Sequence, residues 1–516
     1  MDILDERKNE IMQRNASLPW AIPISINRFF IESLQEAGFK LKEILRKYDI
    51  DNSEKYNYAG KFNHSRLWTK QNEAVTAYEC VSDNESFIAI LMNPRFMAGT
   101  ISEANGEKIA RAFEYAAKKK MPMVAFCASG GVRIQEDAIG LVQMAKIDAA
   151  LQKHSEKGLA YISVLLDPTY GGTSASFGMM GDVIIAEKNA RIGFGGRKLV
   201  ENILHEKIED DFQTAESALE NGGVDVVCAR GEIIDNVLHY LRLMKPAAST
   251  NDNEKPEYDY ERKDPATVWS SHRNNKRTFN ISSSLFDDLV CLRGDRIGGN
   301  DESLQCGIGS INGTHAVFIA QDKGQDLGDT IRKNFGMTSP EGYRKAMRVA
   351  RLAEKLKLPI LILIDSPGAH PGSSAEKSNQ SIAISECMMS FLKVKTPVIT
   401  IVAGEGCSGG ALALSISDRM AMFSGSMYAV ISPESYASII YNEYTPNSKI
   451  LSSMKYLATD LYDNKLIDDV LRQGNIKYNN RQIRNYFLST LADISSMNTK
   501  ELLKARYDRI RNWDKR

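Results

Sequence analysis

The sequence predicts two tandem α/β domains that are copies of one another. Each half contains two apolar runs that end in glycine-rich turns, and the turns of the two halves keep one spacing. Gly130 and Gly368 are 238 positions apart, and so are Gly171 and Gly409. Unrelated glycines rarely share a spacing beside matching apolar runs, so the repeat indicates an internal duplication.

The apolar runs have the length and composition of buried strands. In the first half they cover residues 121–127 and 162–166, and in the second half residues 358–364 and 398–402. The turns that follow them are Ser129-Gly130-Gly131, Tyr170-Gly171-Gly172, Ser366-Pro367-Gly368 and Ser408-Gly409-Gly410. Each half therefore has two strand ends where the backbone can approach a ligand closely.

A helix is predicted ahead of the first strand of each half, over residues 102–120 and 340–357, because apolar residues recur there at helical spacing. Ser339 is the expected N-cap of the second helix, with Pro340 at its first helical position. Helix and strand thus alternate along the chain, which favours the α/β class.

Four segments are expected along the chain. They are an N-terminal extension without a zinc ribbon (1–80), a first domain (81–245), a linker (246–276) and a second domain (277–516). Apolar residues are sparse in the linker, so we do not expect it to bury a core.

Composition excludes several functional classes. The 516 residues include 65 Lys plus Arg and 65 Asp plus Glu, so a global basic field for binding nucleic acid is absent. No apolar run approaches the roughly 20 residues of a membrane span. The seven cysteines contain no C-x-x-C pair, so neither a metal site nor a dithiol motif is predicted. Scattered cysteines suit the reducing cytoplasm, where we expect the protein.

The glycine turns could carry chemistry or only packing. A helix that begins at such a turn offers unpaired N–H groups and the positive end of its dipole, which can stabilise a developing oxyanion. A Gly-Gly pair before a helix more often marks tight packing, but two such turns in register favour a functional role. The core motifs hold no Ser-His-Asp set and no H-E-x-x-H, so a reaction without a protein nucleophile fits better.

Longer motifs resemble a known family, the carboxyltransferase of bacterial acetyl-CoA carboxylase. Over roughly residues 85–235 the chain looks like its β subunit, and over roughly 285–515 like its α subunit. The β-like motifs are Ala128-Ser129-Gly130-Gly131-Val132-Arg133-Ile134-Gln135-Glu136, Asp167-Pro168-Thr169-Tyr170-Gly171-Gly172-Thr173 and Arg191-Ile192-Gly193-Phe194-Gly195-Gly196. The α-like motifs are Asn334-Phe335-Gly336-Met337, Pro340-Glu341-Gly342-Tyr343, Ser366-Pro367-Gly368-Ala369, Gly404-Glu405-Gly406 and Ile431-Ser432-Pro433-Glu434.

The resemblance implies a crotonase-like fold of the ClpP/crotonase superfamily in each half. It implies transfer of a carboxyl group from carboxybiotin, carried on a partner protein, to acetyl-CoA, which gives malonyl-CoA. The β-like half would hold the coenzyme A thioester and the α-like half the biotin. The implied partners are the biotin carboxyl carrier protein, biotin carboxylase and a second copy of this chain, in a homodimer or larger assembly.

The resemblance also assigns roles to residues of this chain. Gly171 and Gly172 match the oxyanion hole for the acyl thioester, and Gly410 and Ala411 match the one for biotin. The remaining residues of the acyl-CoA side are Ser129, Gly130, Gly131, Arg133, Gly195 and Gly196. Those of the biotin side are Pro367, Gly368, Ala369, His370 and Gly409.

Three departures from the family pattern are visible. The four-cysteine zinc ribbon is missing, His370 stands where the pattern has Tyr, and Cys407 where it has Gly. His370 either orients biotin or is an ordinary hydrogen-bonded loop residue. Cys407 is either a reactive thiol or, as we expect, a small packing residue.

These departures leave two other functions open. One is carboxylation or decarboxylation of a different acyl thioester, and the other is a non-catalytic subunit that binds the carrier protein. The fusion of the two halves and the missing ribbon also suggest a specialised duplicate that serves a secondary pathway.

Overall fold

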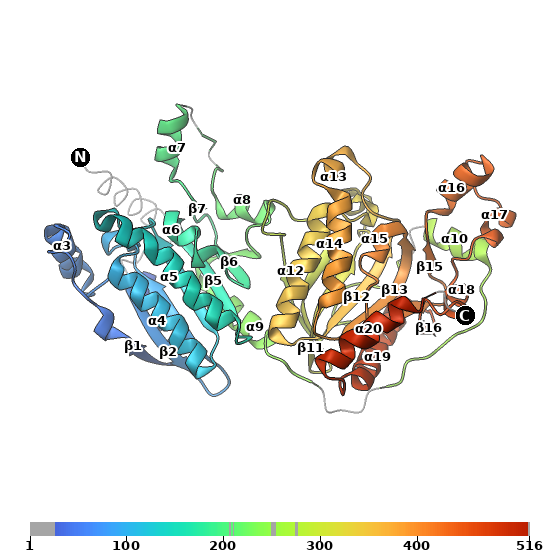
Figure 1. The fold of residues 1–516 in the computed structure, drawn as a ribbon, viewed down its shortest axis with the longest axis horizontal. Helices are drawn as coiled ribbons and strands as arrows, with labels where there is room; N and C mark the ends of the chain where they lie inside the picture. The colour runs from blue at the N-terminus through green and yellow to red at the C-terminus, as the bar shows by residue number, and fades with distance from the viewer. Residues whose placement is uncertain (1–25, 206–207, 210, 249–253, 274–276, 514–516) are drawn as a thin grey trace. The chain divides into compact units, whose positions relative to one another are not determined.

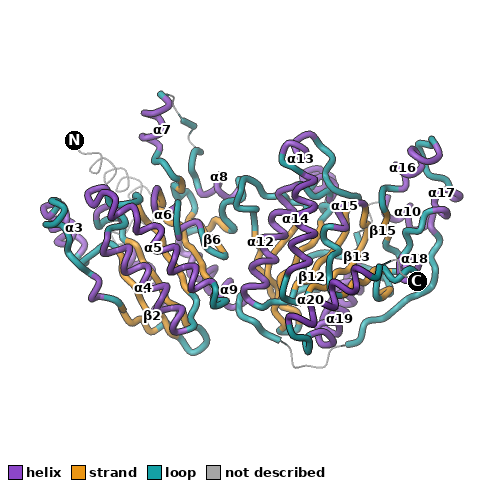
Figure 2. Tube along the Cα trace, viewed as in Figure 1, coloured by secondary structure: helices purple, strands orange, loops and turns teal. Residues whose placement is uncertain are grey.

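A computed structural model describes residues 26–205, 208–209, 211–248, 254–273 and 277–513. The chain forms two compact units, Met1–Arg242 and Leu243–Arg516. Each unit contains an eight-stranded sheet with helices packed on it (Figures 1 and 2). The prediction of two tandem α/β domains is therefore confirmed.

The first unit alternates strands and helices, apart from an antiparallel edge. Its strand order is β1-β2-β3-β4-β5-β6-β8, with β7 paired to the end of β5. The strands are β1 Lys40–Ile44, β2 Val75–Val81, β3 Ser86–Met92, β4 Met123–Ser129, β5 Tyr161–Tyr170, β6 Val183–Glu187, β7 Ile192–Gly193 and β8 Val226–Cys228. The helices are α2 Ile26–Glu36, α3 Ala59–Thr69, α4 Glu103–Lys119, α5 Asp137–Ser155, α6 Gly171–Ser174, α7 Arg197–Leu204, α8 Ala215–Glu220 and α9 Ile233–Leu243.

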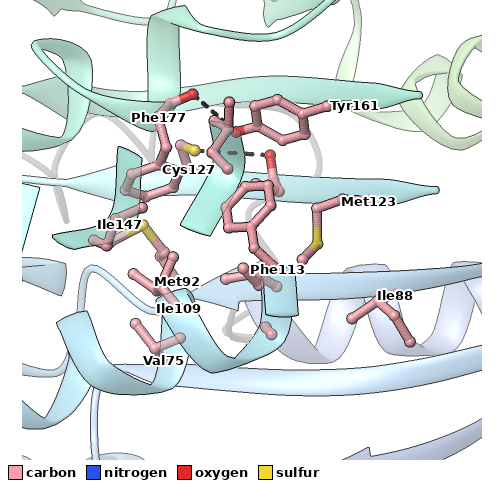
Figure 3. Close-up of a cluster of buried hydrophobic side chains, with 14 of the residues drawn as sticks. Val75, Ile88, Met92, Ile109, Phe113, Met123, Cys127, Ile147, Tyr161 and Phe177 are labelled. Carbon is pink, nitrogen blue, oxygen red and sulfur yellow. Dashed lines mark hydrogen bonds between the residues drawn. The ribbon is translucent and has the colours of Figure 1, made fainter. Parts of the chain in front are cut away.

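The core of the first unit lies between its sheet and the pair of helices α4 and α5, which run side by side over one face (Figure 1). Alternate residues of the strands belong to one core cluster with the apolar face of α4, in which Ile88, Met123 and Cys127 are grouped with Ile109 and Phe113 (Figure 3). This packing holds β4 and β5 rigidly, so the turns at their carboxyl ends have a defined geometry.

The second unit repeats this topology. Its strand order is β16-β14-β13-β12-β11-β10-β9, with β15 paired to the end of β13. The strands are β9 Asp288–Leu292, β10 Leu304–Ile311, β11 Thr314–Gln321, β12 Ile360–Ser366, β13 Val398–Cys407, β14 Arg419–Phe423, β15 Met427–Ala429 and β16 Asp469–Leu471. The helices are α10 Pro265–Arg273, α11 Leu327–Arg332, α12 Pro340–Leu356, α13 Ser373–Lys377, α14 Gln380–Lys393, α15 Ser408–Leu412, α16 Pro433–Tyr436, α17 Ser448–Ser453, α18 Ala458–Asp463, α19 Ile476–Ile494 and α20 Thr499–Arg511, with a π-helical turn at Ala437–Tyr441.

In the second unit, α12 and α14 pack together over one face of the sheet (Figure 1). Part of its core lies on strands β12 and β13, where Leu361 and Ile401 pack in one cluster with Ile483 and Phe487 of α19. All four of these side chains are fully buried. The central strands β12 and β13 are therefore held as firmly as their counterparts in the first unit.

The two units repeat with a spacing of 237 residues, one fewer than the glycines suggested. Helices α4 and α12 both begin one residue after a serine, at Ser102 and Ser339, and both end before a left-handed lysine, Lys120 or Lys357. The left-handed residue that opens the second turn is Gly171 in one unit and Ser408 in the other. Backbone conformation, not glycine identity, defines the register, so Gly172 corresponds to Gly409.

The expected boundary at residue 80 is wrong for the part of the extension that the structure describes. Strands β1 and β2 from this segment pair antiparallel and extend the first sheet. Ile44, Val75 and Ala77 belong to the same core as α4. These residues are part of the first domain because β2 completes the face on which α4 packs. Residues 1–25 of the expected extension lie outside the described residues.

The expected linker also contains a packed segment. Helix α10 lies within residues 246–276, and its Val268 is only 3% exposed, in a cluster with Met427 and Leu457. The backbone N–H of Asp259 donates to Val470 in β16 (2.9 Å). A few well-spaced apolar residues suffice to dock a short helix on an existing core, so low average hydrophobicity misled the prediction. Residues 249–253 and 274–276 lie outside the described residues.

Among the described residues, no helix is both long and apolar enough to cross a bilayer.

Candidate active site

The first glycine turn lies at the carboxyl end of β5, where α6 begins. Gly171 has a φ of 58°, and a Cβ placed on it would lie 3.2 Å from the Cα of Gly131. A Cβ on Gly172 would lie 2.4 Å from a methyl group of Val132. Glycine suits both positions, because Gly171 meets the backbone of the turn after β4 and Gly172 packs against the Val132 side chain.

The turn after β4 is held by a serine. The Ser129 hydroxyl donates to the carbonyl oxygen of Gly131 (3.3 Å) and accepts from the Gly131 N–H (3.0 Å). The second unit has the same arrangement 237 residues later, where the Ser366 hydroxyl donates to Gly368 (2.7 Å) and accepts from its N–H (3.1 Å). Ser129 is therefore a structural hydroxyl that shapes the turn, and it is fully buried.

Strand β7 adds a third segment to the first turn. The N–H of Gly171 donates to the carbonyl oxygen of Phe194 (3.0 Å), so this N–H is already used. The N–H of Gly172 lies in the first turn of α6, where no carbonyl of its own helix is available to it. Gly195 and Gly196 follow directly and lead into α7. The structure thus brings Gly130, Gly131, Gly171, Gly172, Gly195 and Gly196 into one region.

The second glycine turn joins β13 to α15. A Cβ on Gly410 would lie 2.5 Å from the backbone N of Ala369 and 2.8 Å from the Tyr343 hydroxyl. Tyr343 is fully buried and donates to the carbonyl oxygen of Gly410 (3.1 Å). Gly410, in the first turn of α15, therefore packs against the Pro367–Ala369 turn.

An open hollow of about 560 Å³ adjoins this second turn. Gly409 lines this hollow. A Cβ on Gly409 would meet only a methyl group of Ile384, at 3.8 Å. Its walls are mostly apolar and aromatic, with Leu412, Tyr428, Val430, Tyr436, Met454 and Tyr456 among them. A hollow of this size and lining suits a small organic ring bound beside the N–H groups of α15.

His370 and Cys407 differ in environment. The backbone N–H of His370 donates to Thr338 (3.0 Å), and its buried Nδ1 has no hydrogen-bond partner among the described residues. Cys407 is fully buried in the cluster around Met427, and burial raises the pKa of its thiol to about 12. The packing role expected of Cys407 agrees with this environment, because a buried protonated thiol is a poor nucleophile.

A buried charge network lies beneath the second turn. The Lys323 ammonium contacts the carboxylates of Asp365 and Glu405, both at 2.7 Å. Arg273 of α10 binds the other oxygen of Glu405 (2.8 Å) and also contacts Glu434. Burial alone would raise the pKa of Glu405, but Lys323 and Arg273 outweigh it and lower the pKa to about 2. The network clamps the carboxyl ends of β12 and β13 and attaches α10 to them.

Arg133 does not lie where the acyl-CoA assignment requires. Its side chain is 0% exposed, and its guanidinium group makes a two-pronged ion pair with the buried carboxylate of Glu73. Burial would lower the pKa of Arg133, but the charge of Glu73 outweighs it and raises the pKa. A fully paired, buried guanidinium is not available to a phosphate of coenzyme A, so this placement argues against that contact.

The chain is similar to known proteins over most of its length. A family model described as acetyl co-enzyme A carboxylase carboxyltransferase-like matches residues 249–514. The beta/alpha carboxyl transferase subunits of Clostridium tetani acetyl-coenzyme A carboxylase are 37% identical over 467 residues, covering 88% of this chain and 81% of that protein. This chain belongs to the acetyl-CoA carboxylase carboxyltransferase family. It is therefore an enzyme of the transferase class.

Members of this family also exist as separate subunits. The carboxyl transferase alpha subunit of Campylobacter concisus acetyl-coenzyme A carboxylase is 44% identical over 236 residues, which cover 45% of this chain and 76% of that protein. The family match begins at residue 249, ahead of α10. Helix α10 therefore belongs with the carboxyltransferase domain and not with a linker.

Solved structures agree on the fold. A transcarboxylase 12S structure with bound methylmalonyl-coenzyme A superposes with a TM-score of 0.67 at 19% identity, covering 82% of each chain. A single-chain, multi-domain long-chain acyl-CoA carboxylase has a TM-score of 0.66 at 16% identity and covers 94% of this chain and 48% of that one. The expectation of two tandem crotonase-like domains is confirmed.

Several residues of this carboxyltransferase site were missed from the sequence. Asp365 and Glu405 lie beside or within the recognised motifs, but nothing in the sequence pairs them with Lys323. Tyr343 was named only as part of a helix and of a family motif, although its hydroxyl reaches the second glycine turn. Nothing in the sequence indicated that Glu73 forms a buried ion pair, because its partner Arg133 is 60 positions away in sequence. Among the described residues, no three His, Cys, Asp or Glu side chains are grouped to hold a metal ion.

Proposed function

We propose that this chain transfers a carboxyl group from carboxybiotin, carried on a partner protein, to acetyl-CoA, giving malonyl-CoA. The observation that carries the proposal is the pair of glycine turns, one in each crotonase-like unit of a chain from this family. We assign the acyl-CoA thioester to residues 26–242 and the biotin group to residues 254–513. The second assignment is supported by the hollow beside Gly409.

The proposed chemistry requires no side chain to act as nucleophile or base. Carboxybiotin supplies both carbon dioxide and the base that removes the α-proton of the thioester. The chain supplies N–H groups where negative charge develops, from Gly172 toward the thioester oxygen and from Gly410 and Ala411 toward the ureido oxygen. Such preorganised donors act in the transition state, and loss of one typically costs about 100–1000-fold in turnover.

We propose that the chain works with a biotin carboxyl carrier protein and biotin carboxylase, and that it self-associates. Exposed apolar side chains near both turns support an interface. Val430, which lines the hollow beside the second turn, is 77% exposed, and Ile439, Ile440 and Tyr444 follow it in sequence and are also exposed. Phe194, whose carbonyl oxygen accepts from Gly171 of the first turn, is 75% exposed. Exposed apolar groups of this size commonly mark protein contacts. Light scattering tests the assembly, and a fully active monomer would contradict it.

The decisive experiment combines purified protein with a carboxybiotinylated carrier and a panel of acyl-CoA thioesters. We expect carboxylated product with acetyl-CoA as the preferred acceptor, and none when the carrier lacks biotin. Preference for another thioester would show that the carboxyl acceptor is that thioester and not acetyl-CoA. Loss of carboxyl groups without biotin would favour a decarboxylase, and tight carrier binding without any turnover would favour a non-catalytic subunit.

A further inference from the structure

The Arg133–Glu73 ion pair is the centre of a larger buried network in the first unit. Each oxygen of Glu73 has at least one donor besides the guanidinium group. Ser102 donates to one oxygen (3.0 Å), and the Asn105 amide donates to the other (3.0 Å). Glu73 itself is 2% exposed. The carboxylate is therefore fully satisfied and ties the segment before β2 to the start of α4.

The network continues through Tyr58 to Glu136. The Arg133 guanidinium donates to the Tyr58 hydroxyl (3.3 Å), which donates to the Glu136 carboxylate (2.6 Å). The second oxygen of Glu136 accepts from the backbone N–H of Glu103 (2.5 Å). Glu136 is 1% exposed. The middle and the carboxyl end of loop 129–136 are thus fastened to segments that lie outside the glycine motifs.

This loop carries one edge of the first glycine turn. Its Gly130 N–H donates to Ala98 (2.8 Å), its Gly131 carbonyl accepts from Ile101 (2.9 Å), and Gly131 packs on the backbone of Gly171 and Gly172. Any movement of loop 129–136 therefore changes the geometry of the acyl-CoA side. The second unit has His370 at the position of Arg133 and no ion pair there among the described residues, so this support is specific to the first half.

We propose that Glu73 and Tyr58 are positioning residues of the acyl-CoA half, which hold loop 129–136, through Arg133 and Glu136, in the conformation that the glycine turn requires. The inference rests on the proposed function for its catalytic consequence, but its structural part stands without it. It assigns a role to the segment 52–74, for which the sequence offered none.

The test compares two tyrosine variants. Tyr58→Phe removes the hydroxyl that links Arg133 to Glu136. Tyr115→Phe is the control in the same unit, because it likewise removes a tyrosine–glutamate hydrogen bond, from Tyr115 to Glu79 (2.8 Å), away from loop 129–136. Glu73→Gln is a stronger variant, but it leaves Arg133 unpaired and can prevent folding, so Tyr58→Phe is the primary test.

Two readouts separate the inference from the proposed function. Amide hydrogen exchange of residues 129–136 is expected to be about fivefold or more faster in Tyr58→Phe and unchanged in Tyr115→Phe. In kinetics, Tyr58→Phe is expected to lower kcat for acyl-CoA carboxylation about tenfold, with little change in KM and normal decarboxylation of carboxybiotin without acceptor.

Equal exchange in loop 129–136 for both variants would overturn the inference. So would an equal loss of both partial reactions in Tyr58→Phe, which would indicate only general destabilisation. If the wild-type protein carboxylates no thioester, the proposed function fails, and the exchange measurement alone still decides whether Tyr58 holds the loop.

Discussion

Arg133 and His370 occupy the same position in the two halves, yet only Arg133 has a buried acidic partner. The backbone N–H of Arg133 donates to Ile101 (2.8 Å), and 237 residues later the N–H of His370 donates to Thr338 (3.0 Å). Arg133 is locked by Glu73, whereas the Nδ1 of His370 is buried without a partner among the described residues. The duplicated loops have thus acquired different supports.

Replacement of His370 by Phe is expected to leave stability almost unchanged. No side-chain hydrogen bond of His370 is lost, so the free energy of unfolding should change by less than about 1 kcal/mol. Denaturant titration measures it. A loss of several kcal/mol would show that the ring makes a polar contact in solution that the structure does not contain.

Gly410→Ala and Gly409→Ala are expected to behave in opposite ways, although the glycines are adjacent. A methyl group at Gly410 would press on the Ala369 backbone at 2.5 Å, which should cost about 1–3 kcal/mol and separate the two turns. Carboxybiotin decarboxylation should fall by about 100-fold if the N–H geometry is lost. A methyl group at Gly409 would make only an ordinary contact, so the free energy of unfolding of Gly409→Ala should stay the same or rise by up to about 1 kcal/mol. Equal melting temperatures for the two variants would contradict this account.

Glu405 should make stability depend on pH in the acid range. Its pKa is about 2 in the folded protein and 4.5 ordinarily, so its contribution is fully present above about pH 4.5 and is lost as pH falls toward 2. The difference corresponds to a stabilisation on the order of 3 kcal/mol. Glu405→Gln should be less stable at pH 7 by about this amount and should lose less on acidification. Glu434→Gln, which changes a more exposed member of the network, should show a smaller effect.

Thiol labelling should distinguish Cys291 from Cys407. Cys291 is exposed, whereas Cys407 is fully buried and has a thiol pKa of about 12. Iodoacetamide at pH 8 should therefore modify Cys291 first and leave Cys407 unmodified in the folded protein, as measured by peptide mass spectrometry. Unfolded protein, in which both react, is the control. Early modification of Cys407 would show that the second turn opens.

The protein is expected to bind no structural zinc, because its cysteine spacing lacks any paired ligand set. Elemental analysis of protein purified without added metal should find far less than one zinc per chain, and a chelator should leave the melting temperature unchanged. Near-stoichiometric zinc would contradict the expectation.

The sequence by itself determined the duplicated α/β architecture, the strands that become β4, β5, β12 and β13, and the four turns at their ends. These features follow from local patterns, since apolar runs, helical periodicity and glycines act over a few residues. Long motifs were sufficient to indicate the carboxyltransferase family as well.

Only the tertiary structure decided the register and the electrostatic partners. The spacing is 237 and not 238 because Gly171 and Ser408 share the same left-handed backbone conformation, with φ of 58° and 62°. Arg133 forms a buried ion pair with Glu73, and Lys323 forms ion pairs with Asp365 and Glu405. These contacts join segments that are distant in sequence. Such pairings depend on how strands and helices pack, and no local pattern encodes them, so a charge that looked free to bind a ligand proved to be part of the scaffold.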